Sequence, residues 1–387
     1  MLSGSQVTAK RHNMLLKSFG LSAKTTSAIG QGTGKGGPQA REALYDVSYE
    51  RLLRMGIDQG MTLIDTAEEY GMGAAEEVVG SAVRGLRDKI FIATKLSSEH
   101  SSRENVIFAA EQSLKRLKTD YIDLYQIHWP HPSIPVEETV EAMACLVRQG
   151  KVRRLGVCNM PQDLLERAHV AAGETRISSV QAEYNLFDRS LEDELIPFCR
   201  KNHISFLAYS PLDQGRLVNG GRQRALIEEL ASTYDKTPAQ VILRWLIGQE
   251  SVFVIPHTDS EGHLLENAGA ADFDLSEEDM RRIDVICRTE EVRVLGRNIC
   301  VPWKQGHEKL QTREDAVRNR MNFIPSPPEF AESIRAGARI KPIRVRRMPA
   351  GQNADCKFEL LEGKLRYWAW VLAFGDDVEI PALIREQ

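Results

Sequence analysis

Four side chains that can move protons lie at or just after the ends of three expected strands. Asp65, Lys95 and His128 each follow a short apolar, β-branched run, and Tyr70 comes five residues after Asp65. A phenol beside an ammonium group can give a proton to a developing alkoxide, a carboxylate can hold that ammonium in place, and a neutral imidazole can orient a carbonyl oxygen. Each residue alone is better explained by packing, a helix cap or surface charge. Together, the four fit proton transfer to a carbonyl group that accepts a hydride.

The strands that would hold these side chains recur through the first 288 residues. Apolar, β-branched runs occur at 25–33, 61–65, 89–96, 121–129, 152–159, 178–185, 204–211 and 251–256. Amphipathic segments separate them, and roughly 36 residues per strand–helix unit is typical of a (β/α)8 TIM barrel, whose strands share one rim at their carboxyl ends. A doubly wound sheet is the alternative. It is disfavoured because the glycine-rich segment 30–37 has no GxGxxG pattern that opens a helix.

The pattern changes near residue 288, so we expect a barrel at 1–288 and a second domain at 289–387. Residues 288–328 are irregular and rich in Arg and Glu. A helix (329–337), a strand (342–348), a turn (349–355), a strand (356–361), a helix (364–375) and a strand (379–386) follow. This order predicts a small α/β module that uses the preceding segment to complete its core. Arg344, Arg346 and Arg347 would form the solvated face of its first strand.

The composition is that of a globular protein. Hydrophobic residues make up 42% and charged residues 27%, and the formal net charge of -4 argues against nucleic acid or an anionic membrane as the partner. No apolar run reaches the length of a membrane span, and the N-terminus has no signal-peptide pattern. The six cysteines form no CxxC pair, so we expect free thiols, no metal and a cytoplasmic location.

Six segments resemble the signature segments of the aldo-keto reductase family. They are LIDTAEEYG (63–71), IATKL (92–96), DLYQIHWP (123–130), GKVRRLGVCN (150–159), VQAEYNLFDR (180–189) and LAYSPLDQGRL (207–217). The resemblance runs from about residue 14 to 288 and includes every expected barrel strand. It implies that Asp65, Tyr70, Lys95 and His128 form the family's catalytic tetrad, in which Tyr70 is the general acid or base and Lys95 lowers its pKa.

The resemblance also implies a site for NADP(H), with NAD(H) as a second cofactor. The nicotinamide carboxamide would face Asn159 and Gln181, Tyr209 would stack on the ring, and the loop 210–217 would follow the pyrophosphate. The expected cofactor contacts are Gly32, Thr33, Asp65, Asn159, Gln181, Tyr209, Ser210, Pro211, Leu212, Gln214, Gly215, His257, Thr258, His263, Glu266 and Asn267.

The adenosine end of this site departs from the family pattern. Relatives carry a Lys after Ile-Pro and an Arg six residues further on, where this chain has His257 and His263. Glu266 and Asn267, which resemble the family's adenine-contacting pair, are retained. Because histidine is only partly charged near pH 7, we expect a weaker hold on the 2′-phosphate and dual use of NADPH and NADH.

The C-terminal segments 328–348 and 357–386 resemble the ParB N-terminal/sulfiredoxin-like domain. In that superfamily a strand leads through a Gly-containing turn into a helix whose N-terminus binds phosphates. The resemblance implies a nucleotide or phosphorylated ligand at Glu362, Gly363, Lys364 and Arg366. The turn has no cysteine, which excludes sulfiredoxin chemistry. It also departs from the partitioning proteins, because Lys364 and Leu365 replace the first two residues of the Glu-Arg-Arg that usually follows the glycine. A structural appendage, used for packing or dimerisation, is the slightly favoured alternative, and DNA binding is the least favoured.

Two functions are consistent with these residues. An enzyme would reduce an aldehyde or ketone with NAD(P)H, or oxidise the matching alcohol, in a pocket with Trp129 as one wall; a buried packing tryptophan is the alternative for that residue. A regulatory protein would sense NAD(P)H in the barrel and report through the C-terminal domain to a nucleotide or partner. The complete tetrad favours the enzyme, because a sensor has no need of a proton donor.

Overall fold

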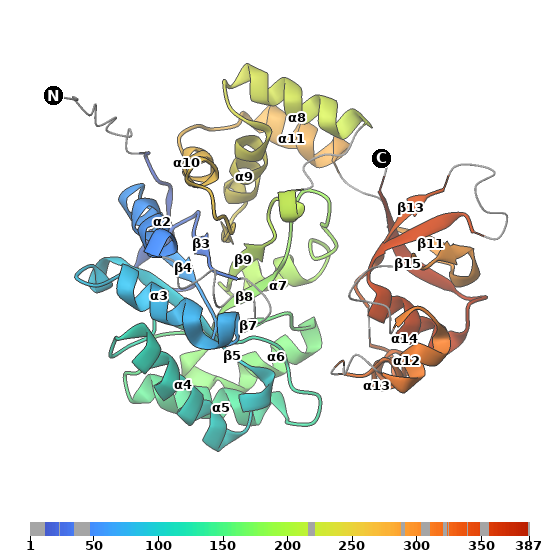
Figure 1. Cartoon of the computed structure of the whole chain (residues 1–387), viewed down its shortest axis with the longest axis horizontal. Coiled ribbons are helices and arrows are strands. Elements are labelled where there is room, and N and C mark those ends of the chain that lie inside the picture. The colour runs from blue at the N-terminus through green and yellow to red at the C-terminus, as the bar shows by residue number, and fades with distance from the viewer. Residues whose placement is uncertain are drawn as a thin grey trace. The chain divides into compact units, whose positions relative to one another are not determined.

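The chain folds into two compact units in the computed structural model (Figure 1). The described residues are 12–22, 24–34, 47–215, 221–287, 291–302, 310–319, 323, 325–338, 340–348 and 356–385. The first unit comprises Met1–Leu186, Leu191–Leu217 and Leu226–Ile283. The second comprises Phe187–Ser190, Val218–Ala225 and Asp284–Gln387.

The first unit is built on an eight-stranded parallel sheet. Its strands are β3 (Gln31–Gly32), β4 (Leu63–Asp65), β5 (Phe91–Leu96), β6 (Leu124–Ile127), β7 (Leu155–Cys158), β8 (Ile177–Glu183), β9 (Ser205–Tyr209) and β10 (Val252–Val254), paired in chain order. Parallel bridges Ile29↔Val254 and Gly32↔His257 join the first strand to the last. The sheet is therefore closed, in agreement with the predicted (β/α)8 barrel, and the carboxyl ends of its strands share one rim.

Helices surround this sheet (Figure 1). They are α2 (Val47–Asp58), α3 (Ala74–Ala82), α4 (Arg103–Leu117), α5 (Val136–Arg148), α6 (Gln162–Ala171), α7 (Leu195–Lys201), α8 (Gly221–Thr233), α9 (Pro238–Gly248), α10 (Glu261–Gly269) and α11 (Glu277–Ile286). Local sequence explains their limits. Helix α9, for example, begins with a capping box between Thr237 and Gln240 and with Pro238 in its first turn, which satisfies backbone donors that have no partner inside the helix.

The expected first strand, 25–33, is two strands in the structure. β2 (Thr25–Ser27) pairs antiparallel with β1 (Leu16–Ser18), and only β3 joins the barrel sheet. The chain bends at Ala28. At Gly30 a Cβ atom would lie 2.8 Å from the Leu63 side chain, so no larger residue fits there. Phe19, which lies between β1 and β2, is fully buried among Phe91 and other barrel side chains.

The second unit contains a five-stranded mixed sheet in the order β11-β15-β13-β14-β12. Its strands are β11 (Glu291–Leu295), β12 (Ile299–Cys300), β13 (Ile343–Arg347), β14 (Phe358–Glu362) and β15 (Glu379–Arg385), and its helices are α12 (Arg313–Arg318), α13 (Pro327–Arg335) and α14 (Lys364–Phe374). Strands β11 and β12 and helix α12 arise from the segment expected to be irregular. They contribute Val294, Ile299 and Ala316 to the core, so the module does draw on that segment. The expected turn 349–355 lies outside the described residues.

Two sequence-based expectations about the second unit are wrong. Cys300 and Cys356 form a disulfide with Cα atoms 5.6 Å apart, so these two are not free thiols, whereas Cys145, Cys158, Cys199 and Cys287 are free. Arg344 is buried rather than solvated, because its guanidinium pairs with Asp188 at 2.8 Å and with Glu362 at 2.7 Å. Burial alone would raise the pKa of Asp188, but Lys341 and Arg344 lower it to about 2.

Among the described residues, no helix is long and apolar enough to cross a membrane.

Candidate active site

The four candidate catalytic residues come from three neighbouring strands and one loop at the rim of the barrel. Lys95 in β5 is fully buried, and its Nζ atom donates to Asp65 Oδ2 at 2.6 Å, to the Thr66 carbonyl at 2.8 Å and to the Tyr70 hydroxyl at 3.1 Å. Tyr70 opens the short 3-10 turn η1 (Tyr70–Gly73), which follows β4. The pleat of β4 and β5 thus directs the carboxylate and the ammonium toward the same phenol.

The electrostatics of this cluster keep the ammonium charged and the phenol neutral. Burial alone would lower the pKa of Lys95, but the charges of Asp65 and Tyr70 raise it above its usual range. Burial raises the pKa of Tyr70, and Lys95 opposes that rise without reversing it. Lys95 acts on Tyr70 in the expected direction, since its charge and its hydrogen bond both lower the pKa of the phenol, but burial raises that pKa by more. A protonated phenol beside a fixed cation is suited to proton donation.

His128 follows β6 and lies beside the phenol. Its ring meets that of Tyr70 edge-on with centroids 5.6 Å apart, and it stacks on Trp129 at 6.5 Å. Trp129 is half exposed, so the alternative of a buried packing tryptophan is wrong. The indole is thus exposed beside the imidazole.

Residues at the next three strand ends carry the groups expected to hold a nicotinamide. Gln181 Nε2 in β8 donates to Asp65 Oδ1 at 2.7 Å, and the Tyr209 hydroxyl at the end of β9 donates to Asn159 Oδ1 at 2.9 Å. Asn159 Nδ2 donates in turn to the His128 carbonyl at 3.2 Å. Two amides and a half-buried phenol ring adjoin the catalytic cluster, and these are groups that fit a flat ring bearing a carboxamide.

The loop after β9 contains the residues expected along the pyrophosphate. Ser210 has a φ of 48°, Gly215 a φ of 79°, and Pro211 is buried. Asn185 Nδ2 donates to the Ser210 carbonyl at 3.3 Å and supports the start of the loop. The structure places the backbone of Leu212 and Gln214 in the same loop; the Gln214 side chain and residues 216 and 217 lie outside the described part.

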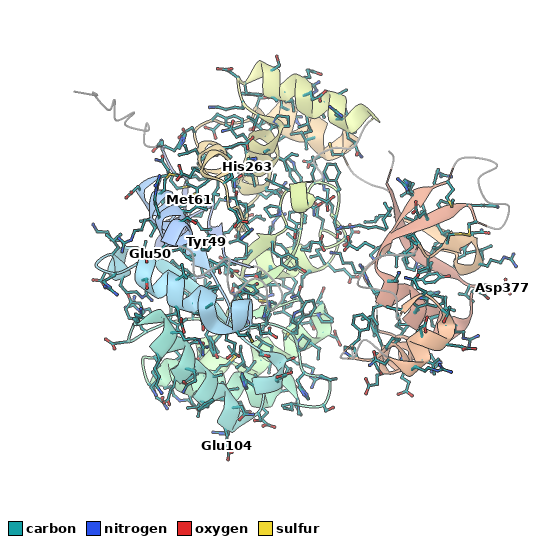
Figure 2. All side chains as sticks on the ribbon, viewed as in Figure 1. Tyr49, Glu50, Met61, Glu104, His263 and Asp377 are labelled. Atoms are coloured by element: carbon teal, nitrogen blue, oxygen red, sulfur yellow. A yellow bond between two sulfur atoms is a disulfide. The ribbon has the colours of Figure 1, made fainter. Side chains whose placement is uncertain are left out.

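Three of the expected cofactor contacts, Gly32, Thr258 and Asn267, line one small cavity, whereas His257, His263 and Glu266 do not line it. Its lining residues are Gln31, Gly32, Tyr49, Leu52, Leu53, Met61, Pro256, Thr258, Leu264 and Asn267; Figure 2 labels two of them, Tyr49 and Met61. The neighbouring residue Thr33 is fully buried and donates to the Asp65 carbonyl, so this segment is linked to the catalytic cluster.

The two histidines expected near the 2′-phosphate are exposed. His263 belongs to α10, where Figure 2 labels it, and Glu266 lies one turn further along the same helix. His257 Nε2 lies 3.6 Å from Asp259 Oδ1. This carboxylate adds negative charge next to the position where the family resemblance implied a lysine in place of His257.

The four residues expected to bind a nucleotide in the second unit lie at the start of α14, but their side chains have partners within that unit. Gly363 is in the left-handed conformation, with φ 93°, directly before the helix. Lys364 Nζ donates to the Pro302 carbonyl, and Arg366 Nη1 donates to the carbonyls of Lys341 and Pro342, at 2.8–3.1 Å. Glu362 places a carboxylate at the same turn, bonded to Arg344. These contacts do not form a phosphate cradle.

One contact beside the catalytic cluster was missed from the sequence. Glu69 Oε2 lies 2.5 Å from His128 Nδ1. The only signal was its position next to Tyr70 in the segment LIDTAEEYG (63–71).

Comparison with known proteins agrees with this geometry. Residues 28–288 match the model of the aldo/keto reductase family. The chain is 40% identical over 258 residues to the methylglyoxal reductase YeaE of Escherichia coli, covering 66% of this chain and 89% of that protein. It is 35% identical over 243 residues to the glyoxal reductase of Bacillus subtilis, covering 62% of this chain and 84% of that protein.

A solved structure shows the same barrel. An aldo/keto reductase from Klebsiella pneumoniae, crystallised with NADP and acetate, is 40% identical and superimposes with a TM-score of 0.63, over 69% of this chain and 93% of that one. The match of family model, sequence and fold extends over the residues that carry the rim cluster. The chain therefore belongs to the aldo/keto reductase family of NAD(P)H-dependent oxidoreductases.

Proposed function

We propose that the protein reduces small 2-oxoaldehydes, such as methylglyoxal and glyoxal, to hydroxycarbonyl products with NADPH. The observation that carries this proposal is the buried Lys95 ammonium, bonded at once to Asp65 and to the Tyr70 hydroxyl. The relatives named for methylglyoxal and glyoxal reduction support the substrate class. The Klebsiella pneumoniae complex supports the cofactor.

The roles of the residues follow from their positions. The nicotinamide, when bound, supplies a hydride to the carbonyl carbon. Tyr70 donates its hydroxyl proton to the carbonyl oxygen, so the product is an alcohol, and the phenol regains its proton from water. Lys95 stabilises the transient phenolate, and Asp65 keeps Lys95 charged and in place. His128 and Trp129 border the space in which the carbonyl must lie.

The test measures loss of NADPH absorbance with methylglyoxal, glyoxal, a simple ketone and an aldose. We expect both 2-oxoaldehydes to be turned over. Their kcat/KM should be at least about tenfold above the values for the ketone and the aldose, because the second oxygen of a 2-oxoaldehyde activates the reacting carbonyl. Tyr70→Phe should lower turnover by about 10²–10⁴-fold. Tight binding of NADPH without turnover of any carbonyl would instead support a cofactor sensor.

The cofactor preference gives a second prediction for this site. We expect kcat/KM with NADPH to exceed that with NADH by much less than about a thousandfold, since His257 is only partly charged and Asp259 lies beside it. His257→Lys should raise the preference for NADPH by about tenfold, because a full charge replaces a partial one. Kinetics with both cofactors check this, and an unchanged KM for NADH serves as the internal control. A wild-type preference of about a thousandfold or more for NADPH refutes the idea.

For the second unit we propose a structural role. The resemblance of its sequence to the ParB N-terminal/sulfiredoxin-like domain predicted the strand–glycine–helix order found at β14, Gly363 and α14. Lys364 and Arg366, which a phosphate would need, are bonded to main-chain carbonyls of the unit. Displacing those bonds would leave half-buried carbonyl acceptors without these donors, which opposes the binding of a phosphate at this turn.

A further inference from the structure

The turn that follows Tyr70 has a strained backbone. Gly71, Met72 and Gly73 have φ values of 56°, 55° and 89°, so three consecutive residues lie in the left-handed region. This conformation is unfavourable for Met72, because its Cβ atom crowds the following carbonyl oxygen. The Met72 side chain is 64% exposed, so its own packing does little to hold the turn. Such a conformation persists only where the surrounding structure enforces it.

The side chain of Arg116 packs against this turn. Arg116 belongs to α4, which lies beside α3 (Figure 1). A Cβ atom on Gly73 would lie 2.6 Å from Arg116 Cδ and 2.9 Å from Arg116 Nε. The arginine therefore fills the space that any larger residue at position 73 would need, and only glycine allows this close approach.

Hydrogen bonds to α3 hold Arg116 in that place. Its Nε atom donates to Glu76 Oε2 at 2.6 Å, and its Nη2 atom donates to Ser113 Oγ at 3.2 Å. Glu76 lies in the first turn of α3 and is fully buried. Its other oxygen accepts from the Thr94 hydroxyl at 2.5 Å. Because Thr94 directly precedes Lys95 in β5, the start of α3 is bonded both to α4 and to the strand that carries the catalytic ammonium.

The same guanidinium also pairs with a carboxylate on the other side of Tyr70 in the chain. Arg116 Nη2 lies 3.8 Å from Glu68 Oε2, and Glu68 Oε1 accepts from the Ser97 backbone N–H at 2.7 Å. The backbone N–H of Ala74, the first residue of α3, donates to the Tyr70 carbonyl. Arg116 thus pairs with carboxylates on both sides of the segment that carries the phenol.

We infer that Arg116 is a positioning residue of the carbonyl reduction: it holds the left-handed turn 71–73 from α4 and so keeps the Tyr70 hydroxyl 3.1 Å from the Lys95 ammonium. Arg116 acts through the backbone that follows Tyr70 and not on the substrate. This inference rests on the proposed role of Tyr70 as proton donor, but not on the choice of substrate.

The kinetic test compares wild type with Arg116→Met, with 4-nitrobenzaldehyde, a carbonyl compound without a neighbouring oxygen. We expect kcat per NADPH-binding site to fall about 10–100-fold with the KM for NADPH unchanged, because the phenol is misplaced while the cofactor site is kept. The solvent deuterium isotope effect on kcat should rise, since transfer of the Tyr70 proton then limits turnover. Arg116→Lys, which keeps the charge, should recover part of kcat.

Arg167 provides the control for loss of an arginine ion pair. Its guanidinium joins α6 to α5 by donating to both oxygens of Glu137, at 2.7 and 2.9 Å. Arg167→Met should leave kcat, the KM for NADPH and the isotope effect unchanged. A fall of kcat in Arg116→Met with the wild-type isotope effect would show that Arg116 has only a structural role, and it would overturn the inference.

A second variant disturbs the turn but keeps the ion pair. Gly73→Ala places a methyl group against Arg116 and should lower kcat and raise the isotope effect in the same way. Gly85→Ala is its matched control, because Gly85 has a φ of 78° and nothing lies within 4 Å of an added Cβ atom. If Arg116→Met fails to fold because Glu76 is left buried without its partner, this pair of variants decides. Wild-type kinetics in Gly73→Ala, or an equal loss in Gly85→Ala, overturns the inference.

A third measurement needs no turnover. Fluorine-19 NMR of protein that contains 3-fluorotyrosine reports the surroundings of the nine tyrosines, with Tyr70 assigned from the signal lost in Tyr70→Phe. We expect the Tyr70 signal to shift in Arg116→Met and Gly73→Ala and to keep its position in the two controls. An unchanged Tyr70 signal in both variants contradicts the inference. If wild type reduces no carbonyl, the proposed function fails, whereas the fluorine signals still decide whether Arg116 positions Tyr70.

Discussion

Replacing Lys95 by methionine is expected to lower kcat by about 10²–10⁴-fold and to destabilise the barrel by about 3–5 kcal/mol. The catalytic loss arises because Tyr70 keeps its raised pKa without the cation that opposes the rise. The loss of stability arises because Asp65, which is almost fully buried, loses its ion pair at 2.6 Å. Methionine matches the length of lysine, so the effect of packing is kept small.

Tyr70→Phe is the matched control for this prediction. It removes the proton donor but keeps the Lys95–Asp65 pair, so kcat should fall to a similar extent while the free energy of unfolding changes by only about 1 kcal/mol. Steady-state kinetics and denaturant unfolding of both variants separate the two effects. A Lys95→Met enzyme that keeps kcat within about tenfold of wild type would show that the ammonium is structural and does not tune the phenol.

Removing the Cys300–Cys356 disulfide is expected to destabilise the second unit by about 4 kcal/mol, since the bridge closes a loop with a sequence separation of 56 residues. The double variant Cys300→Ser and Cys356→Ser, or a reducing agent, should therefore increase hydrogen exchange in β13 and β14. Exchange in the barrel strand β5 should stay unchanged, because the bridge lies within the second unit. Hydrogen exchange with mass spectrometry follows both regions in one experiment.

Cys145→Ser provides the control for the cysteine-to-serine change. Cys145 is free and half-buried, so its replacement should affect neither unit by more than about 0.5 kcal/mol. Thiol titration of the unfolded, unreduced chain should find the four free cysteines. Six reactive thiols, or equal exchange in the double variant and wild type, would contradict the prediction.

The sequence predicted the barrel and its rim cluster because both depend on regular features. Parallel strands place their carboxyl ends at one rim, so Asp65, Lys95 and His128, each at a strand end, had to converge wherever the loops ran. The helices and strands at 327–385 were also found close to their expected limits. Each helix has its own starting residue, and each strand has its own alternation of apolar and polar residues.

Contacts between distant segments were decided only by the tertiary structure. Arg344 read as a solvated strand residue, yet it is buried because Asp188, 156 residues away in sequence, supplies a carboxylate. Cys300 and Cys356 read as free thiols because pairing depends on the approach of β12 to the segment before β14, which no spacing rule reveals.

The properties of the individual groups at the rim were likewise decided partly by the sequence and partly by the tertiary structure. Residue types and strand ends alone determined that a phenol, an ammonium, a carboxylate and an imidazole would meet. Burial, which the sequence does not measure, decided that Tyr70 has a raised pKa, and the path of one loop decided that Glu69 lies against His128. Periodic patterns specify which elements form, whereas desolvation and side-chain pairing depend on what the folded chain brings next to each atom.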